Sequence, residues 1–412
     1  MTPQPRINRI TVWFMAIAAA LGTAASYPLQ PAVADVAASL DISLTQAGVA
    51  LAFGPVGYLV GLAILVPLVD RFPPNYVLAA QFGALAIASA ANAAAGSLWV
   101  LTLTVGFIGA CSTVGAQLSS ITARFVPDGR RATALGIVTA GISAGIISGR
   151  IAGGALTDVV GWRAGLLVFA LAFAATAVVA FRILPTTTGS LTKSYLTTLR
   201  GLPGLYLRFP TLRMAAVRGA LWFFAFCAVW AGLAVALAAP PYSYSAERIG
   251  LYALAGLLGI LATRVAGTWT DRVGPRRVML IGLAIAALGA ITVAGCLSNT
   301  AATLVGLAVF DAGLFAAQVA NQSMVLAIDP VAPARFNSAY MVVYFVGGSL
   351  GTAFGAAAVA WIGWLPTVAV TAAAIAVAML LSGPEPRRAT SAAAGPMSRP
   401  TCHRTRDTRG RW

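Results

Sequence analysis

The stretch Gly145-Ile-Ile-Ser-Gly149-Arg150-Ile-Ala-Gly153 is the most informative part of the sequence, because its three regularly spaced glycines recur about 200 residues later. The second copy reads Gly347-Gly-Ser-Leu-Gly351-Thr-Ala-Phe-Gly355. Two dipeptides recur at nearly the same spacing, Asp70-Arg71 as Asp271-Arg272 and Gly161-Trp162 as Gly363-Trp364. A duplication of this length in an apolar chain is typical of transporters with two homologous halves, in which the substrate binds between the halves.

The composition is that of an integral membrane protein. Hydrophobic residues make up 59% of the 412 residues and charged residues only 9%, whereas a soluble domain carries roughly 25% charged residues. Apolar stretches recur along the chain at the length that a bilayer core of about 30 Å requires of a helix. The net charge of +16 comes from short loops and the C-terminal tail, so it indicates membrane orientation rather than nucleic-acid binding.

The sequence offers little for catalysis or metal binding. The single histidine, His403, lies in the tail, and the four cysteines are far apart. We therefore expect no disulfide framework, no metal site and no cofactor. A membrane-embedded enzyme acting on lipid would need a nucleophile with a base, or a metal cluster, at membrane depth. The chain also has no ATP-binding loop of the GxxxxGK[ST] type, so we expect neither an enzyme nor an ATP-driven pump.

The apolar pattern predicts twelve transmembrane helices in two six-helix bundles, covering residues 10–181 and 214–381. The predicted spans are 10–31, 45–68, 76–95, 98–124, 132–157, 164–181, 214–238, 249–269, 278–298, 301–326, 336–360 and 365–381. Residues 1–9 form a short N-terminal segment, and the first span is read as an uncleaved helix rather than a signal peptide. Residues 182–213 are predicted to be an amphipathic linker at the membrane surface, and residues 382–412 a basic, disordered tail.

The distribution of Lys and Arg predicts the orientation. In this arrangement nearly all basic loop residues, the linker and the arginine-rich tail fall on one side, and only Arg163 and Arg248 lie on the other. Positive residues favour the cytoplasmic side. We therefore expect a multi-pass protein of the bacterial cytoplasmic membrane with both termini in the cytoplasm.

One loop carries a specific family signature. The sequence Gly267-Thr-Trp-Thr-Asp271-Arg272-Val-Gly274-Pro-Arg276-Arg277 resembles the loop motif of the major facilitator superfamily, and the loop with Asp70 and Arg71 is a degraded copy. A carboxylate at a helix end can bind a neighbouring helix in one state and release it in another. These residues are therefore predicted to gate the cytoplasmic surface. The alternative is that their charges only fix the topology.

The glycine-rich span five is similar to the antiporter motif of drug:proton antiporters in the same superfamily, with Arg150 in place of the family's proline. The resemblance covers residues 10–382 and implies a major facilitator fold with two pseudo-symmetric bundles. Residues 101–117 also lack the arginine usual in span four of drug:proton antiporters. Both departures weaken the hypothesis that the protein exports multiple drugs. The ridges of Gly145, Gly149, Gly153, Gly347, Gly351 and Gly355 are predicted to pack helices closely, and a sliding interface is a further possibility.

Arg150 and Asp311 are the leading candidates for the transport path. Both are ionisable residues predicted to lie well inside spans, where an arginine costs about 3 kcal/mol to insert. Arg150 is expected to face a central cavity and to seek an anionic partner, for which Asp311 is the best internal candidate. The alternative is a static buried ion pair that locks the halves together.

Several polar residues could complete the path. Gln318, Asn321 and Gln322 lie on or beside the Asp311 face of span ten, and Tyr340 and Tyr344 share a face of span eleven. On span one, Tyr27 and Gln30 precede Pro31 and are expected to line the outer cavity. Arg218, about one turn inside span seven, either snorkels to the surface or contacts substrate.

The leading hypothesis is a secondary active transporter that exports a small organic solute by alternating access in exchange for protons, working as a monomer. The alternatives are a coupled uptake permease for a small organic anion, a membrane-embedded enzyme and a non-transporting sensor. Asp311 would be the proton-responsive group, since its affinity for protons depends on contact with Arg150.

Overall fold

The structure is a computed structural model that describes residues 7–187, 202–329 and 333–382. The regular structure in these ranges is helical, as the sequence predicts. The first half contains α1 (Arg9–Ala24), α2 (Val33–Leu40), α3 (Leu44–Leu51), α4 (Phe53–Ile64), α5 (Leu68–Arg71), α6 (Pro74–Ala93), α7 (Leu98–Cys111), α8 (Val114–Phe125), α9 (Asp128–Val160) and α10 (Trp162–Ile183). The second half contains α12 (Leu202–Arg208), α13 (Pro210–Ala238), α14 (Ala246–Leu251), the 3-10 helix η1 (Tyr252–Ala255), α15 (Gly256–Val273), α16 (Pro275–Gly295), α17 (Thr300–Leu326), α18 (Pro333–Ile362) and α19 (Trp364–Leu380).

The helices match a membrane-spanning bundle. Among the described residues, 10 helical segments are long and apolar enough to cross a membrane. Two shorter apolar helices, α1 and α19, lie where spans one and twelve are predicted. The count of twelve spans therefore stays a prediction, while the all-helical membrane fold is confirmed. Residues 188–201 of the predicted linker and residues 383–412 of the predicted tail lie outside the described residues.

The glycine ridges pack helices within each half. A Cβ atom at Gly145 would lie 2.3 Å from the carbonyl oxygen of Ala20, and one at Gly347 would lie 2.3 Å from that of Ala220. The ridge of α9 therefore lies directly against α1, and the ridge of α18 lies against α13 in the same way. Gly149, Gly351 and Gly355 also meet the backbone of these partner helices, and Gly153 meets the backbone of Pro28 in the connection that follows α1. Two copies of one helix contact explain why the glycine pattern occurs twice.

The repeated Gly-Trp dipeptides form matching turns. Gly161 (φ +83°) ends α9 and Gly363 (φ +85°) ends α18, in a backbone region that glycine adopts without steric cost. Each following tryptophan then starts the next helix and donates a hydrogen bond from Nε1: Trp162 to Ser39 Oγ (2.9 Å), and Trp364 to the carbonyl of Val293 (3.1 Å). The duplicated sequence thus builds duplicated helix corners.

The prediction for the end of the first span is wrong. A helix over residues 10–31 is predicted, but α1 ends at Ala24 and α2 begins at Val33. Pro28 and Pro31 lack backbone N–H groups and cannot continue a helix. The connection between the helices carries Tyr27 and Gln30, which is why these side chains do not follow helical geometry.

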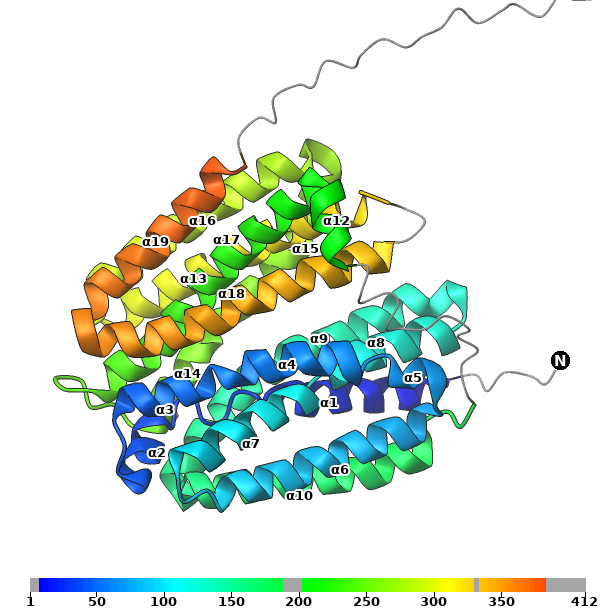
Figure 1. Ribbon diagram of the computed structural model, residues 1–412, viewed down its shortest axis with the longest axis horizontal. Coiled ribbons are helices and arrows are strands. Elements are labelled where there is room, and N and C mark those ends of the chain that lie inside the picture. Colours follow the sequence, from blue (N-terminus) through cyan, green and yellow to red (C-terminus); the bar gives the residue numbers. More distant parts are fainter. Residues whose placement is uncertain (1–6, 188–201, 330–332, 383–412) are drawn as a thin grey trace, which may run out of the picture. The chain divides into compact units, whose positions relative to one another are not determined.

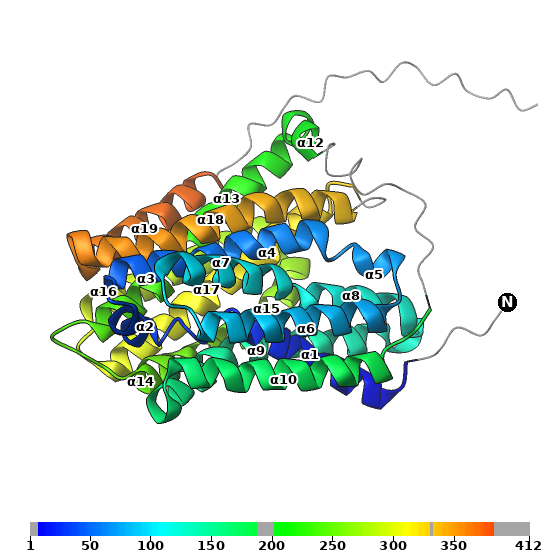
Figure 2. The ribbon, with the colours of Figure 1, turned by 60° about the horizontal axis from the view of Figure 1, so that its bottom comes forward.

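The two halves meet most closely at one end of the bundle (Figures 1 and 2). We call this the α14 end, and the opposite end, where α5 and α12 lie, the linker end. Helices α3 and α4 contact α18, and α9 contacts α14. The halves approach closely at Gly154, where a Cβ atom would lie 2.3 Å from the carbonyl oxygen of Ala246, and at Gly48, where one would lie 2.4 Å from Cβ of Ala356. Deeper in the bundle, the rings of Tyr58 and Phe345 pack across the halves with centroids 4.7 Å apart.

A carboxylate joins the halves at the α14 end. Asp158, near the end of α9, accepts hydrogen bonds from the backbone N–H groups of Ala246 (3.1 Å) and Glu247 (3.0 Å) in the first turn of α14. These N–H groups have no partner within their own helix, and the positive end of the helix dipole favours a negative charge there. Asp158 therefore fastens the first half to the second.

Candidate functional site

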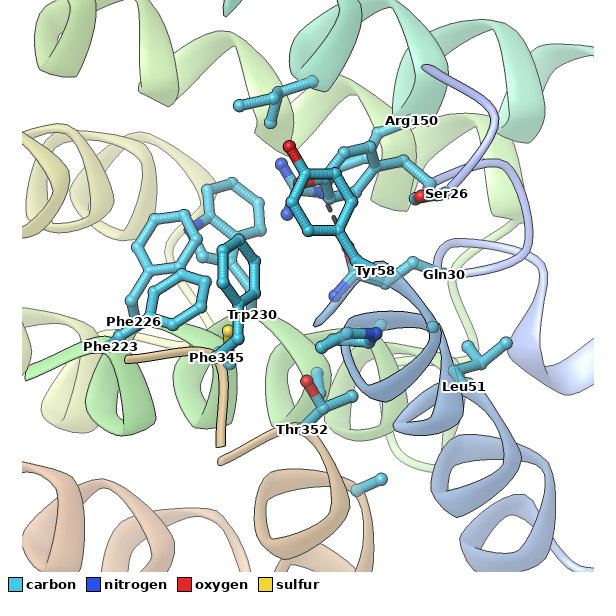
Figure 3. Close-up of a pocket in the computed structure, with 18 of the residues that line it drawn as sticks. Ser26, Gln30, Leu51, Tyr58, Arg150, Phe223, Phe226, Trp230, Phe345 and Thr352 are labelled. Atoms are coloured by element: carbon cyan, nitrogen blue, oxygen red, sulfur yellow. Dashed lines mark hydrogen bonds between the residues drawn. The ribbon is translucent and has the colours of Figure 1, made fainter. Parts of the chain in front are cut away.

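A cavity of about 260 Å³ lies between the two halves. The first half lines it with residues from the connection after α1 and from α3, α4 and α9, and the second half with residues from α13, α17 and α18. Figure 3 shows Arg150, Ser26 and Gln30 on one side and a group of aromatic rings, including Phe223, Phe226 and Trp230, on the other. Of the predicted path residues, Arg150, Tyr27, Gln30 and Tyr344 line this cavity.

Arg150 is held in the cavity wall by three neighbours. Its side chain is only 5% exposed, and its Nε donates a hydrogen bond of 2.6 Å to Gln30 Oε1. The guanidinium carbon lies 4.6 Å from the ring centroid of Tyr27 and 4.5 Å from that of Trp230. Each cation–π contact of this kind contributes roughly 0.5–2 kcal/mol, which offsets part of the cost of burying the charge.

Asp311 lies just behind the cavity wall. The carboxylate is 2% exposed, and its Oδ1 accepts a hydrogen bond of 3.1 Å from Trp230 Nε1. The expected direct ion pair between Arg150 and Asp311 is not among the contacts of the described residues. Instead, the indole of Trp230 contacts both groups, Arg150 through its ring face and Asp311 through its N–H.

The internal repeat relates the residues around Arg150 to one another. Gly145 packs on Ala20 of α1, and its counterpart Gly347 packs on Ala220 of α13. Ala20 and Ala220 are therefore equivalent positions, and α1 and α13 can be aligned on them. In that register, Gln30 corresponds to Trp230, and both contact Arg150. On α18 the position matching Arg150 is Thr352, which also lines the cavity. Sequence reasoning missed Trp230 and Thr352. Extending the glycine repeat from Arg150 would have identified Thr352, whereas the match of Gln30 with Trp230 follows from the helix packing.

Apart from Tyr344, the aromatic wall that the second half contributes was also missed. The rings of Phe223 and Tyr344 stack with centroids 3.9 Å apart and an interplanar angle of 11°, and Trp222 packs on Tyr344 at 4.9 Å. The ring centroids of Phe226 and Trp230 lie 6.4 Å apart, so Phe226 continues the aromatic wall to the Arg150 site. Nothing in the hydrophobic pattern separates these rings from lipid-facing ones, because every face of such a helix is apolar.

Four predicted path residues lie outside the cavity lining, in a polar network inside the second half. Tyr340 Oη donates a hydrogen bond to Gln318 Oε1 (2.5 Å). Asn321 Nδ2 donates to the carbonyl of Ala215 (2.9 Å), and Gln322 Nε2 donates to Asn337 Oδ1 (2.9 Å). These hydrogen bonds join α17 to α13 and α18. The four residues therefore hold helices of the second half together.

Arg218 does not snorkel. It is 6% exposed, and its Nη1 donates a hydrogen bond of 3.2 Å to the carbonyl oxygen of Leu381, just beyond α19. The last carbonyl groups of a helix lack partners within the helix and attract a cation. Arg218 therefore connects α13 to the end of α19, away from the cavity.

The predicted gating loops lie at the linker end. Gly274 has φ +88° and forms the turn between α15 and α16, and Arg276 Nε donates a hydrogen bond of 2.7 Å to the carbonyl of Ser382. The remaining loop residues with described side chains are partly or fully exposed: Arg71, Gly267, Asp271, Arg272 and Arg277. The side chain of Asp70 lies outside the described part. Within the described residues, the hydrogen bonds of these loops stay inside one half.

The residues that the structure describes contain no group of three or more His, Cys, Asp or Glu side chains able to hold a metal ion. What the site offers is a buried cation, an aromatic wall and a nearby carboxylate. This arrangement suits reversible binding of a solute between the two halves.

The sequence profile of the Major Facilitator Superfamily matches residues 12–263 and 220–401. The protein named "Uncharacterized transporter YgaY" of Escherichia coli O157:H7 is 29% identical over 379 residues, covering 92% of this chain and 96% of that protein. "Probable transporter SCO4007" of Streptomyces coelicolor is 30% identical over 401 residues, covering 94% of this chain and 90% of that protein.

Solved structures show the same fold. A bacterial homologue of the human lysosomal transporter Spinster, in an inward-facing and occupied conformation, superimposes with a TM-score of 0.74 at 14% identity, covering 90% of this chain and 95% of that chain. The nucleoside transporter NupG superimposes with a TM-score of 0.73 at 11% identity, covering 90% of this chain and 98% of that chain.

Proposed function

The chain belongs to the Major Facilitator Superfamily and is a multi-pass membrane transporter, and from this premise we propose that it exports a small organic solute in exchange for protons by alternating access. In this proposal the protein lies in the bacterial cytoplasmic membrane with both termini in the cytoplasm. One chain suffices, since a single copy holds both halves and the cavity between them.

The observation that carries the proposal is the position of the cavity relative to the contacts between halves. Asp158 joins the halves at the α14 end, whereas the described loop bonds at the linker end stay within one half. The basic residues of the loops gather at the linker end, which supports a cytoplasmic location for it. The described conformation then corresponds to an inward-facing state, ready to load solute from the cytoplasm.

Asp311 is the proposed proton site. A carboxylate at membrane depth costs roughly 2.5–3.5 kcal/mol when charged, so its charge state depends on its contacts. Protonation would weaken its hold on the N–H of Trp230 and free the indole that supports Arg150. Proton binding and the position of the cavity's cation are coupled in this way through a single side chain.

Coupled uptake of a small organic anion is the second candidate. It is favoured by Arg150, the charged residue in the cavity lining, because a cation in a membrane cavity attracts an anionic solute. The two candidates share the binding site and the proton site, and they differ in the direction of net flux.

Purified protein in proteoliposomes with an imposed pH gradient tests the proposal. Organic anions, sugars and antibiotics are screened as labelled solutes, and internal pH is followed with a trapped dye. We expect solute movement against its gradient, accompanied by proton movement in the opposite direction. An ionophore that dissipates the pH gradient should abolish it. Uphill solute movement that survives the ionophore, or solute flux without proton flux, would contradict proton-coupled export.

A further inference from the structure

The edge of the Arg150 guanidinium is available to a ligand. The rings of Tyr27 and Trp230 cover its two faces, and Gln30 accepts from Nε. Among the described residues, no protein atom accepts a hydrogen bond from either Nη atom. A planar guanidinium with both faces covered presents its remaining N–H donors in its own plane, where a carboxylate binds with two parallel hydrogen bonds.

The charge of the cavity lining favours an anion. Arg150 lines the cavity, and no Asp or Glu is found among the described lining residues. Asp311 turns its Oδ1 toward Trp230 rather than toward the guanidinium. A buried cation that lacks a carboxylate in contact is stabilised by any bound anion, and it repels cationic solutes.

The remaining walls favour a flat apolar group. Rings of Phe223, Phe226 and Phe345 face the space beside Arg150 (Figure 3), and Phe345 packs edge-on against Phe223 with centroids 5.6 Å apart. Aromatic rings bind other rings by offset-stacked and edge-to-face contacts. Since an apolar cavity of about 150 Å³ holds benzene, the 260 Å³ here suits a molecule of one or two rings.

We propose that the cavity binds an aromatic monocarboxylate, with the carboxylate on the Nη edge of Arg150 and the ring against Phe223, Phe226 and Phe345. This assignment rests on the proposed transport function and names its class of solute. It separates the protein from exporters of cationic drugs, because a positive ligand would meet Arg150 with no carboxylate in the lining to compensate it.

Equilibrium binding to the purified full-length protein tests the assignment without requiring flux. The probes are 1-naphthoate, the neutral 1-naphthamide, the cation 1-naphthylmethylammonium and the aliphatic octanoate, each measured by calorimetry. We expect 1-naphthoate to bind at least about tenfold more tightly than the amide, since a charge-assisted hydrogen-bonded pair is lost. The cation should not bind, and octanoate should bind more weakly than 1-naphthoate.

Two variants locate the site. Arg150→Gln should weaken 1-naphthoate binding by at least about tenfold and remove the preference for acid over amide. Arg264→Gln, at an exposed arginine of α15, is the matched control and should bind like the native protein. If Arg150→Gln does not fold, as judged by thermal unfolding, the affinities of the native protein for 1-naphthoate and 1-naphthamide still test the proposed carboxylate site.

Equal affinity for acid and amide, tighter binding of octanoate, or no binding of 1-naphthoate would overturn the assignment. Failure of the proposed function looks different. In that case 1-naphthoate binds with the expected preference, but proteoliposomes show no flux that depends on the pH gradient.

Discussion

Trp230 donates a hydrogen bond from Nε1 to Asp311 Oδ1 over 3.1 Å, while the face of the same indole lies 4.5 Å from the guanidinium carbon of Arg150. One side chain thus connects the buried carboxylate of α17 with the buried cation of α9. The tryptophan comes from α13, so the contacts that link Asp311 to the first half run through a side chain of the second half.

Replacing Asp311 by Asn should abolish uphill transport and leave solute exchange. Asn keeps an acceptor for Trp230 but cannot exchange a proton. Counterflow and pH-gradient-driven accumulation in proteoliposomes measure the two activities separately. Asp41→Asn is the matched control, because Asp41 is exposed and has the left-handed conformation that Asn tolerates. Intact accumulation in Asp311→Asn would exclude Asp311 as the coupling site.

Two substitutions of Trp230 should separate coupling from binding. Trp230→Phe keeps a ring face for Arg150 and deletes the N–H to Asp311, so we expect near-native solute binding with a changed pH dependence of flux. Trp230→Leu deletes both contacts and should also weaken binding, by the roughly 0.5–2 kcal/mol of one cation–π contact. Binding and flux are measured across a range of pH. Identical behaviour of the two variants would show that the N–H has no separate role.

Replacing Asp158 by Ala should favour states in which the α14 end is open. The substitution removes both acceptors of the Ala246 and Glu247 N–H groups, an interaction with a helix N-terminus that contributes about 0.3–2 kcal/mol. Distances between spin labels placed on the two halves at this end report the population of each state. Glu247→Gln, in the same helix turn but on its exposed face, serves as the control. An unchanged distance distribution in Asp158→Ala would exclude this role.

Two glycines of the same helix should respond oppositely to a methyl group. A Cβ atom at Gly145 would lie 2.3 Å from the carbonyl oxygen of Ala20, whereas one at Gly136 would meet nothing within 4 Å. Gly145→Ala should lower the free energy of unfolding by about 1–3 kcal/mol through overpacking. Gly136→Ala should be neutral or stabilising by up to about 1 kcal/mol. Thermal unfolding in detergent compares them, and equal melting temperatures would contradict the helix contact.

Accessibility of single cysteines should establish the orientation. We expect a membrane-impermeant maleimide to label Ser298→Cys on intact cells, because this exposed residue lies at the α14 end between α16 and α17. Thr186→Cys, exposed at the linker end after α10, should be labelled only after the membrane is opened. Both are made in a chain whose native cysteines are replaced by serine. The reverse pattern would place the termini outside.

Sequence alone determined the membrane fold and its duplication. Long apolar runs must become helices in lipid because every backbone polar group needs a partner inside the segment. The paired glycines identify matching helix contacts because only glycine permits backbones to approach so closely. These are local or periodic properties, so residues such as Gly145 and Gly347 reveal them without coordinates. Arg150 could also be singled out, since a charge at membrane depth is costly wherever it lies.

The polar groups that share a cavity could be identified from the three-dimensional packing alone. Asp311 and Gln318 lie on one face of α17, yet the first approaches the Arg150 site through Trp230 while the second binds Tyr340 inside the second half. Helical periodicity gives the face of a residue but not the neighbour that covers it. In a helix that is apolar all round, the face toward the cavity resembles the face toward lipid, so the partners of Arg150 depend on how the two halves pack.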